Sequence, residues 1–539
     1  MPPMPFPLSR RQFLRATGAA TLATAWGPHL ARGADVGRAG PGGGANAAAD
    51  GAAADSLAGP SRGPWRRLFL DATTVEASGG LARVFHSAVK ASANPVIKAD
   101  RPWESGRAIS GPYVYGTVFR DGNRLRLWYQ VLNQGNHVGY AESLDGVVWT
   151  KPELGLIAYE GSKANNLVVS AFQPEVTGGT CHNPSVIRRH GEPDPAKQYA
   201  LYGYDGAAKH PRVAWSPDGL RWRYDPATER TPLFNSADVV NFFRDPYEAR
   251  YAATWKTRNR RGRAVGIAWS ADGLNWTKPF DGPIFTADDL DPDATQIYGM
   301  PVFAYQGLYV GQPWIYRARY FKSGDYSVKK LHEAQADSLR TMEVQLAWSW
   351  DLMNWTRPPA RDQFIPLGAP GEWDDGMIFT AGAPVVMGDK LHFYYGGCDG
   401  FHDDKRVKTA IGLATLRLDG FCSLRAGADE GWFISRREPM REPAVTINAR
   451  TAPTGVIAAE ILDRQNRVVP GFSREECISF SGDSVRHELT WKTARFATEA
   501  SGEEWKIRFW LKDAELFSHL PRALDPGQPD LSRFQKTGP

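Results

Sequence analysis

The sequence predicts an all-β fold, a five-bladed β-propeller followed by a C-terminal β-sandwich, and two observations carry that prediction. A turn of the form Ser-x-Asp-Gly-x-x-Trp recurs along residues 64–426. The composition is rich in turn formers and aromatic residues, with 54 glycines, 39 prolines, 19 tryptophans and 19 tyrosines against 23% charged residues. Such a composition is typical of short strands joined by tight turns rather than of helices.

The recurring turn marks the repeat unit. Its copies occupy residues 143–149, 216–222, 270–276, 349–355 and 418–421. The fourth copy has leucine in place of the glycine, and the fifth is degenerate. Asp-Gly suits a tight turn between the outer two strands of a blade, and we expect the tryptophan to pack over that hairpin. A hairpin and a strand precede each turn, so every unit supplies about four strands, the content of one propeller blade.

The N-terminal residues predict export. Ser9-Arg10-Arg11-Gln-Phe-Leu precedes a weakly apolar, Ala/Thr-rich stretch, as in bacterial twin-arginine signals, so residues 1–34 are interpreted as a signal peptide. Residues 35–63 are rich in glycine and alanine and are expected to form a disordered linker. These features predict a periplasmic or secreted protein that uses the twin-arginine translocase. No membrane span is expected after removal of the signal.

The repeat ends before the last hundred residues of the chain. Residues 64–426 are assigned to the propeller, and residues 427–522, where apolar and polar residues alternate between turn signals, are assigned to an accessory β-sandwich. Residues 523–539 are rich in Pro, Asp and Gln and are expected to form a flexible tail.

Charge and cysteine content exclude several functional classes. The net charge is +5 over 539 residues, with no basic run in a recognisable binding motif, so no nucleic-acid partner is expected. The four cysteines stand at wide, irregular spacing and indicate neither a disulfide framework nor a zinc site, although one bridge stays open. No cofactor and no catalytic metal are expected, and the acidic loop at 288–293 leaves a structural calcium open.

Several motifs resemble those of a known group of enzymes. They are Pro102-Trp103-Glu104, the stretch 140–152, Glu372-Trp-Asp-Asp375-Gly and the stretch 455–463. Over about residues 68–516 the chain resembles the five-bladed propeller glycoside hydrolases of families 32 and 43, and more closely the exported family-32-like proteins of planctomycete-type bacteria. The resemblance implies an exported glycoside hydrolase that cleaves an oligo- or polysaccharide with paired carboxylates.

We expect the carboxyl groups of such an enzyme at the starts of the innermost strands. Glycoside hydrolysis uses two carboxyl groups on opposite sides of the scissile bond, and the inner strands face the central funnel. Counting back seven to nine residues from each hairpin turn locates these starts. The catalytic candidates are Asp238, Asp293, Asp375, Glu372 and Glu104, and Glu343 near the start of a third strand is a weaker one. A strand cap, a solvated acidic loop and a surface salt bridge are the competing structural roles.

Substrate contacts are expected from aromatic and polar residues near the same starts, because sugar rings stack on aromatic faces and sugar hydroxyls form hydrogen bonds with His and Asn. The substrate-binding candidates are Trp103, Tyr113, His182, Asn183, Asn241, Tyr298, Trp373 and His402. The tryptophans of the Asp-Gly turns are interpreted as core residues instead.

Asp245 is the most tempting aspartate, because Arg244-Asp245-Pro246 resembles the Arg-Asp-Pro triplet of family 32, in which the aspartate is functional. Alignment with the first repeat, however, puts Asp245 in a hairpin turn at the end of the inner strand, away from its start. We therefore interpret Asp245 as a turn residue.

Two other functions stay open. A non-catalytic carbohydrate-binding propeller would show the same turns without converging carboxyl groups. A sialidase would show Asp-boxes, but the glycine here directly follows the aspartate, so the box is one residue short, and no arginine triad can be identified. Fold alone does not decide among these functions.

Overall fold

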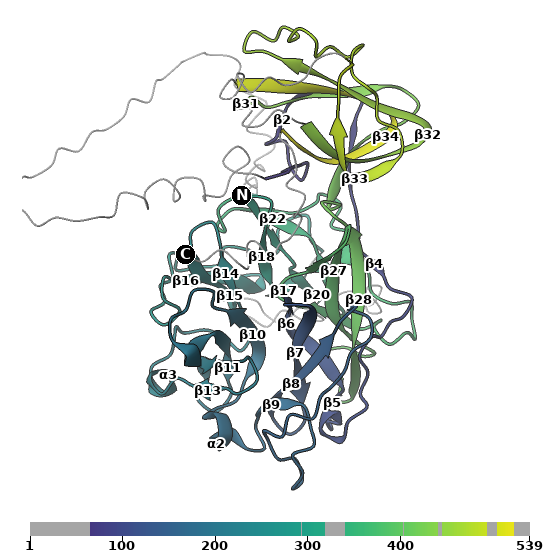
Figure 1. Ribbon diagram of the computed structural model, residues 1–539. Coiled ribbons are helices and arrows are strands. Elements are labelled where there is room, and N and C mark those ends of the chain that lie inside the picture. Colours follow the sequence, from purple (N-terminus) through teal and green to yellow (C-terminus); the bar gives the residue numbers. More distant parts are fainter. Residues whose placement is uncertain are drawn as a thin grey trace, which may run out of the picture. The chain divides into compact units, whose positions relative to one another are not determined.

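The structure is a computed structural model that describes residues 65–292, 294–317, 340–402, 404–439, 445–492 and 504–521. Regular structure in these ranges is almost entirely β-strand, which confirms the predicted all-β class (Figure 1). The helices are single turns, namely α2 (Pro174–Thr177), α3 (Ala227–Arg230) and the 3-10 turns η1 (Pro102–Glu104) and η2 (Pro195–Lys197). The predicted signal peptide (1–34), linker (35–63) and tail (523–539) lie outside the described residues.

Four small antiparallel sheets form a propeller-like arrangement (Figure 1). The first contains β6 (Pro112–Asp121), β7 (Arg124–Leu132), β8 (Asn136–Ser143) and β9 (Leu167–Ser170). The second contains β10 (His182–Arg188), β11 (Tyr199–Asp205), β12 (His210–Ser216) and β13 (Arg223–Tyr224). The third contains β14 (Val240–Asp245), β15 (Arg250–Asn259) and β16 (Gly262–Ser270). The fourth contains β18 (Val302–Tyr305), β19 (Leu308–Gly311), β22 (Ala347–Ser349) and β23 (Trp355–Thr356).

The fifth repeat does not form a separate sheet, which corrects the prediction of five separate blades. Its strands β25 (Met377–Thr380), β26 (Val385–Met387), β27 (Lys390–Cys398) and β28 (Val407–Arg417) belong to a ten-stranded sheet. That sheet also contains β17 (Thr295–Gly299), β20 (Trp314–Arg317), β21 (Met342–Gln345), β24 (Gln363–Ile365), β4 (Val89–Lys90) and β5 (Ile109–Ser110).

Proline explains how the fourth repeat is divided between two sheets. Pro301 separates β17 from β18, and Pro313 separates β19 from β20. Proline has no backbone N–H and interrupts a strand ladder, so each half of the repeat pairs by itself. The half that contains β21 then joins the fifth repeat through one parallel pair, Met342 with Met377.

The two-sheet sandwich predicted for residues 427–522 is not confirmed. These residues contribute to a single nine-stranded sheet around the long strands β32 (Val445–Leu462) and β34 (Glu504–Leu520). Its other strands are β29 (Cys422–Ala426), β30 (Gly431–Ser435), β31 (Glu438–Pro439), β33 (Asp483–Leu489), β1 (Arg67–Leu68), β2 (Val75–Gly79) and β3 (Ala82–Phe85). Strands from both ends of the described chain meet here, a long-range pairing that local alternation cannot predict.

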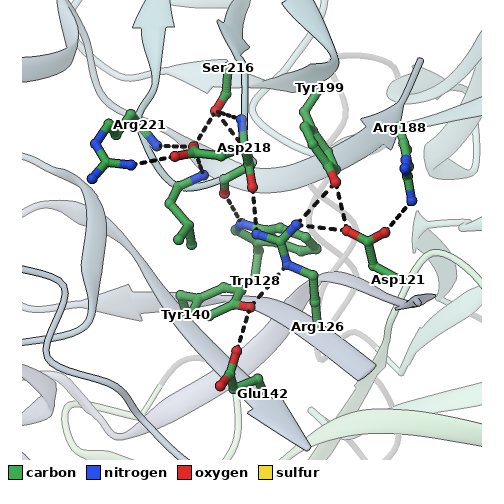
Figure 2. Close-up of polar contacts among 12 residues, drawn as sticks. Asp121, Arg126, Trp128, Tyr140, Glu142, Arg188, Tyr199, Ser216, Asp218 and Arg221 are labelled. Carbon is green, nitrogen blue, oxygen red and sulfur yellow. Dashed lines mark hydrogen bonds and ion pairs between the residues drawn. The ribbon is translucent and has the colours of Figure 1, made fainter. Parts of the chain in front are cut away.

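Each Asp-Gly turn is held by its own side chains. In the second copy, Ser216 Oγ accepts a hydrogen bond from the Gly219 N–H at 2.8 Å, and Asp218 Oδ1 accepts one from the Leu220 N–H at 2.8 Å (Figure 2). Gly219 has a φ of +78°, a left-handed conformation that glycine adopts at little cost. In the fourth copy Leu352 takes the same conformation, with a φ of +66°.

The turns also fasten neighbouring repeats to one another, a role that the sequence did not reveal. Trp128 Nε1 of the first repeat donates to the Gly219 carbonyl of the second at 2.8 Å, beside Arg126, which donates to the Asp218 carbonyl at 2.6 Å (Figure 2). Tyr394 of the fifth repeat donates in the same way to the Gly146 carbonyl of the first, at 2.8 Å. The turn glycines therefore serve a second purpose, because a side chain there would meet the donor of the neighbouring repeat.

The described ranges also bear on disulfide bonds and on membrane-spanning helices. Cys181, Cys398, Cys422 and Cys477 are buried, free thiols. No helix in the ranges that the structure describes is long and apolar enough to span a membrane.

Candidate active site

The first strands of three repeats are irregular near their starts. The register shifts at 113–117 in β6, at 182–185 in β10 and at 297–299 in β17. A bulge of this kind bends the strand and redirects its side chains, and bulges are common beside active sites. Side chains at the same relative place in three repeats are thereby turned out of the regular ladder.

These redirected side chains contact one another. Tyr115 lies, between ring centroids, 5.0 Å from Tyr113, 5.3 Å from His182 in an edge-on contact, and 5.0 Å from Trp314 in a parallel stack. Phe379 contacts both Tyr115, at 4.9 Å, and Tyr298, at 6.2 Å. We call this group the inter-repeat cluster; its members are Tyr113, Tyr115, His182, Tyr298, Trp314 and Phe379.

Asp238, which precedes β14, brings the third repeat to this cluster. Its Oδ1 atom lies 2.5 Å from Nζ of Lys256 on β15, and the Asp238 side chain is 49% exposed whereas that of Lys256 is 12% exposed. Lys256 Nζ in turn lies 4.5 Å from the ring centroid of Tyr298. The Lys256 N–H donates to the Val239 carbonyl at 2.9 Å, which fixes the Asp238 segment against β15. The carboxylate is therefore anchored by one cation and still accessible.

The ionisation of the site follows from burial and from this ion pair. Burial acts to raise the pKa of Asp238, but the neighbouring Lys256 ammonium outweighs it and holds the pKa below its ordinary value. Burial lowers the pKa of Lys256, although Asp238 opposes that effect. Burial lowers the pKa of His182 to about 4, so this imidazole is neutral at neutral pH. Its Nδ1 atom has no hydrogen-bond partner among the described residues.

The tyrosines of the cluster stay protonated. Burial raises the pKa of Tyr113 and of Tyr115 well above the ordinary value, and burial together with Asp238 raises the pKa of Tyr298. A protonated phenol donates a hydrogen bond and presents an apolar ring face. The rings of Tyr113, Tyr115, Trp314 and Phe379 are at most 5% exposed, so the accessible groups of the site include the Asp238 carboxylate and the partly exposed Tyr298.

Asn183 and Asn241 lie beside the cluster but are bonded to each other. Asn183 Nδ2 donates to Asn241 Oδ1 at 3.4 Å, and the two residues are 2% and 7% exposed. The Asn183 N–H donates to Gln130 Oε1 at 2.8 Å, with φ at +60°. These contacts join the first three repeats, so part of the hydrogen-bonding capacity of both amides is already used.

His402 and Arg263 border the cluster on the side of the fourth repeat. His402 Nε2 lies 3.3 Å from the Tyr298 hydroxyl. The guanidinium carbon of Arg263 lies 5.4 Å from the ring centroid of Tyr298 and 5.2 Å from that of Tyr316. Cations over tyrosine faces are attracted by the ring quadrupole.

Glu104 and Trp103 occupy a different, buried place. Glu104 is fully buried, accepts the Tyr129 hydroxyl at 2.8 Å and pairs with Lys151 at 2.8 Å. Trp103 is 8% exposed and donates from Nε1 to Asn166 at 2.9 Å. Both side chains thus anchor η1 to the first sheet rather than face the inter-repeat cluster.

Residues 372–375 contain three carboxyl side chains, of which Asp374 is buried and Glu372 and Asp375 are accessible. Asp374, which is 1% exposed, accepts the Tyr395 hydroxyl at 2.8 Å and pairs with Lys90 at 2.6 Å. Trp373 stacks on the ring of Tyr395 at 5.7 Å. Glu372 and Asp375 accept backbone N–H groups of their own turn. None of the hydrogen bonds or ion pairs that these carboxyl groups form within the described residues reaches Asp238.

Comparison of the repeats separates anchors from the candidate site. The residue two positions after the turn tryptophan is Lys151, Lys278 or Arg357 in three repeats. Lys151 pairs with Glu104, Arg357 pairs with Asp291 at 2.7 Å, and Lys278 lies 4.0 Å from the ring centroid of a tryptophan on β15. Glu104 and Asp291 are therefore equivalent buried anchors. Asp238 is bound by a cation of β15 instead, which leaves it accessible.

The remaining candidate carboxylates, Asp245 and Glu343, are buried where the structure describes them. Asp293 lies outside the described residues. Asp245 ends β14, is fully buried, and accepts the Tyr309 hydroxyl at 2.9 Å, as a structural turn residue does. Glu343 is 6% exposed and pairs with Arg317 at 2.5 Å. Among the described residues, no group of three or more His, Cys, Asp or Glu side chains could hold a metal ion.

Sequence reasoning missed Lys256 and Arg263. A signal was present, because residues 256–263 read Lys-Thr-Arg-Asn-Arg-Arg-Gly-Arg, five cations in eight residues. Their position next to an inner-strand start becomes visible only once β15 and β16 are seen to extend past the start of β14.

Comparison with known proteins finds remote structural likeness. No protein-family model matches the chain. No curated protein matches it either. Similar solved structures include a glycosyl hydrolase from Bacteroides ovatus, with 14% identity and a TM-score of 0.41 over 62% of this chain and 94% of that one. Another is a family 32 β-fructofuranosidase from Bombyx mori, with 10% identity and a TM-score of 0.36 over 81% of this chain and 94% of that one.

Proposed function

We propose that the chain is an exported glycoside hydrolase whose inter-repeat cluster binds the sugar and whose Asp238 is a catalytic carboxylate. The observation that carries the proposal is the contrast among the carboxyl groups. Glu104 and Asp374 are buried anchors, whereas Asp238 is half exposed, held by Lys256 and surrounded by tyrosines and a neutral histidine from other repeats.

The residues of the site have different roles in this proposal. Asp238, with its pKa held low, is ionised at neutral pH, which suits a general base or a nucleophile rather than a general acid. Lys256 orients that carboxylate, and the partly exposed ring of Tyr298 offers contact surface for a sugar. Hydrolysis also requires a second carboxyl group across the scissile bond, and we propose Asp293 or the Glu372/Asp375 pair for this place.

A non-catalytic carbohydrate-binding protein is the second candidate. The observation that favours it is that, within the described ranges, Asp238 is the one predicted carboxyl group whose charge acts on the pKa values of Tyr113, Tyr115, His182 and Tyr298 in the inter-repeat cluster. A single carboxylate among aromatic rings binds sugar hydroxyls well but does not by itself complete the pair that hydrolysis uses.

The experiment that separates the two candidates is a turnover screen. The protein from residue 35 onward is incubated with a panel of plant and algal glycans, and release of reducing ends is measured for the wild type, Asp238→Asn and Asp375→Asn. Asp389→Asn is the matched control, because that carboxylate is 63% exposed and pairs with Arg486, which does not belong to the inter-repeat cluster. We expect Asp238→Asn to lower kcat by at least about a hundredfold, as loss of a general base does. Unchanged turnover in Asp238→Asn would remove the site assignment, and binding without turnover of any glycan by the wild type would establish the second candidate.

Three finer points belong to the same proposal. We propose that the fifth repeat closes the propeller-like arrangement against the first repeat, since the Tyr394 hydroxyl donates to the Gly146 carbonyl. We also propose export through the twin-arginine route to the periplasm or the exterior, on the strength of residues 9–14. Closeness to planctomycete-type proteins stays a prediction from the motifs.

A further inference from the structure

The hairpin that connects β15 to β16 carries an unusual concentration of positive charge next to Asp238. The residues of this hairpin pair in strict antiparallel register, with Arg258 directly opposite Arg263 and Lys256 opposite Val265. Residues directly opposite each other share one face of a sheet, and so do residues two apart on one strand. Lys256, Arg258 and Arg263 therefore lie on the same face.

Placing like charges directly opposite each other costs stability, so the arrangement calls for a functional explanation. Arg258 and Arg263 both act to lower the pKa of Lys256, which shows that the three cations are close enough to repel. Asp238 pairs with Lys256. Arg263 forms no ion pair with any carboxylate among the described residues.

Arg263 is also held in a fixed position. Its guanidinium lies over Tyr298 and Tyr316 at 5.4 and 5.2 Å, and one Nη atom donates to Gln296 Oε1 at 2.9 Å. One hydrogen bond and two ring contacts leave several of the five N–H donors of a guanidinium for another acceptor. A preorganised, half-buried arginine of this kind suits bidentate recognition of a planar or tetrahedral anion.

We infer that Arg263 forms a subsite for an anionic substituent, and that the saccharide bound at the inter-repeat cluster is acidic, carrying a carboxylate or a sulfate ester. This inference rests on the proposed function. It places the anion near Asp238, because Lys256, which pairs with Asp238, and Arg263 both lie over the ring of Tyr298. The positive hairpin then also attracts the acidic chain from solution.

The test compares sugars that differ only in charge. Binding of the protein from residue 35 onward is measured by calorimetry with oligogalacturonate, oligomannuronate and oligoglucuronate, each against its methyl ester, and with a sulfated oligosaccharide against its desulfated form. Inorganic polyphosphate serves as a polyanion without sugar. The variants are Arg263→Gln, Arg263→Lys and, as matched control, Arg221→Gln, whose side chain is 68% exposed on the turn at 216–222 (Figure 2).

We expect at least one acidic oligomer to bind about tenfold or more tightly than its uncharged form. Arg263→Gln removes that difference, Arg263→Lys keeps part of it, and Arg221→Gln leaves it unchanged. The carboxylate and sulfate pairs show which anion the subsite takes. Equal binding of charged and uncharged forms, no preference in any pair, or binding of polyphosphate as tight as that of the sugars would overturn the inference.

The outcome is independent of the catalytic proposal. One possible result is that a neutral glycan is hydrolysed, that Asp238→Asn stops this hydrolysis and that Arg263→Gln does not alter it. In that case the proposed function stands and the acidic subsite fails. If an acidic oligomer binds through Arg263 without turnover, the subsite stands and the hydrolase proposal fails. Thermal unfolding of each variant confirms that the substitutions act on binding rather than on folding.

Discussion

The pair formed by Glu104 and Lys151 provides a decisive test of the distinction between anchor and site. The two side chains are 0% and 5% exposed, and their 2.8 Å contact is joined by the Tyr129 hydroxyl at 2.8 Å. Replacing Lys151 by Met leaves the Glu104 carboxylate buried without its cation. Breaking a buried pair in this way costs about 3–5 kcal/mol, because the remaining charge keeps its desolvation penalty.

The matched control is an exposed ion pair in the same repeat. Arg124 pairs with Glu142, and their side chains are 55% and 24% exposed. Exposed pairs contribute about 0–1 kcal/mol, so Arg124→Met should change stability little. Urea unfolding followed by tryptophan fluorescence measures both free energies, and turnover of folded protein is assayed in parallel. For Glu104→Gln we expect a lower free energy of unfolding with kcat retained.

Two results would refute this reasoning. If Lys151→Met costs no more than Arg124→Met, Glu104 is not held as a buried anchor. If Glu104→Gln abolishes turnover while the protein stays folded, Glu104 acts on substrate, as its sequence motif suggests, and is not a structural anchor.

The remaining predictions concern a turn, a titration and export. Gly273→Ala should destabilise the protein more than Gly388→Ala, because both glycines have positive φ but only at Gly273 would the Cβ atom meet a neighbouring tyrosine hydroxyl, at 2.2 Å; equal melting temperatures would contradict this. The pKa of His182 is lowered to about 4, so between pH 6.5 and 4 the unfolded chain binds a proton that the folded chain does not. The free energy of unfolding should therefore fall as the pH drops through this window, and His182→Asn should flatten the measured dependence of that free energy on pH. Changing Arg10 and Arg11 to Lys should retain the protein in the cytoplasm of a bacterial host, which fractionation checks; export at the wild-type level would exclude the twin-arginine route.

Local chemistry made part of this fold readable from the sequence. The all-β class follows from turn and aromatic content, and the Asp-Gly turns lie where the motif places them, because a side-chain hydrogen bond and a positive φ are decided within four residues. Counting back from the hairpin turns located the segments around Tyr113, His182 and Tyr298, and the structure shows these segments in one cluster. Their role in binding substrate stays a prediction.

Partner choice across long distances was not readable. Glu104 and Asp238 each precede the first strand of their repeat, yet Glu104 pairs with Lys151 after the outer turn and Asp238 pairs with Lys256 on the second strand. The same limit applies to the sheets. Strands β1–β3 pair with residues more than 300 positions away, and a proline in the ladder divides the fourth repeat, so the number and content of the sheets differ from the repeat count.

The sequence by itself therefore determined the strand content, the repeat and the location of the strand starts, because these depend on residues close together in the chain. Only the tertiary structure decided which carboxylate stays accessible and which cations face it. Each of the two acids pairs with a lysine of its own repeat, but the Glu104 side chain is fully buried whereas that of Asp238 is 49% exposed, and this difference in burial depends on how segments far apart in the chain pack.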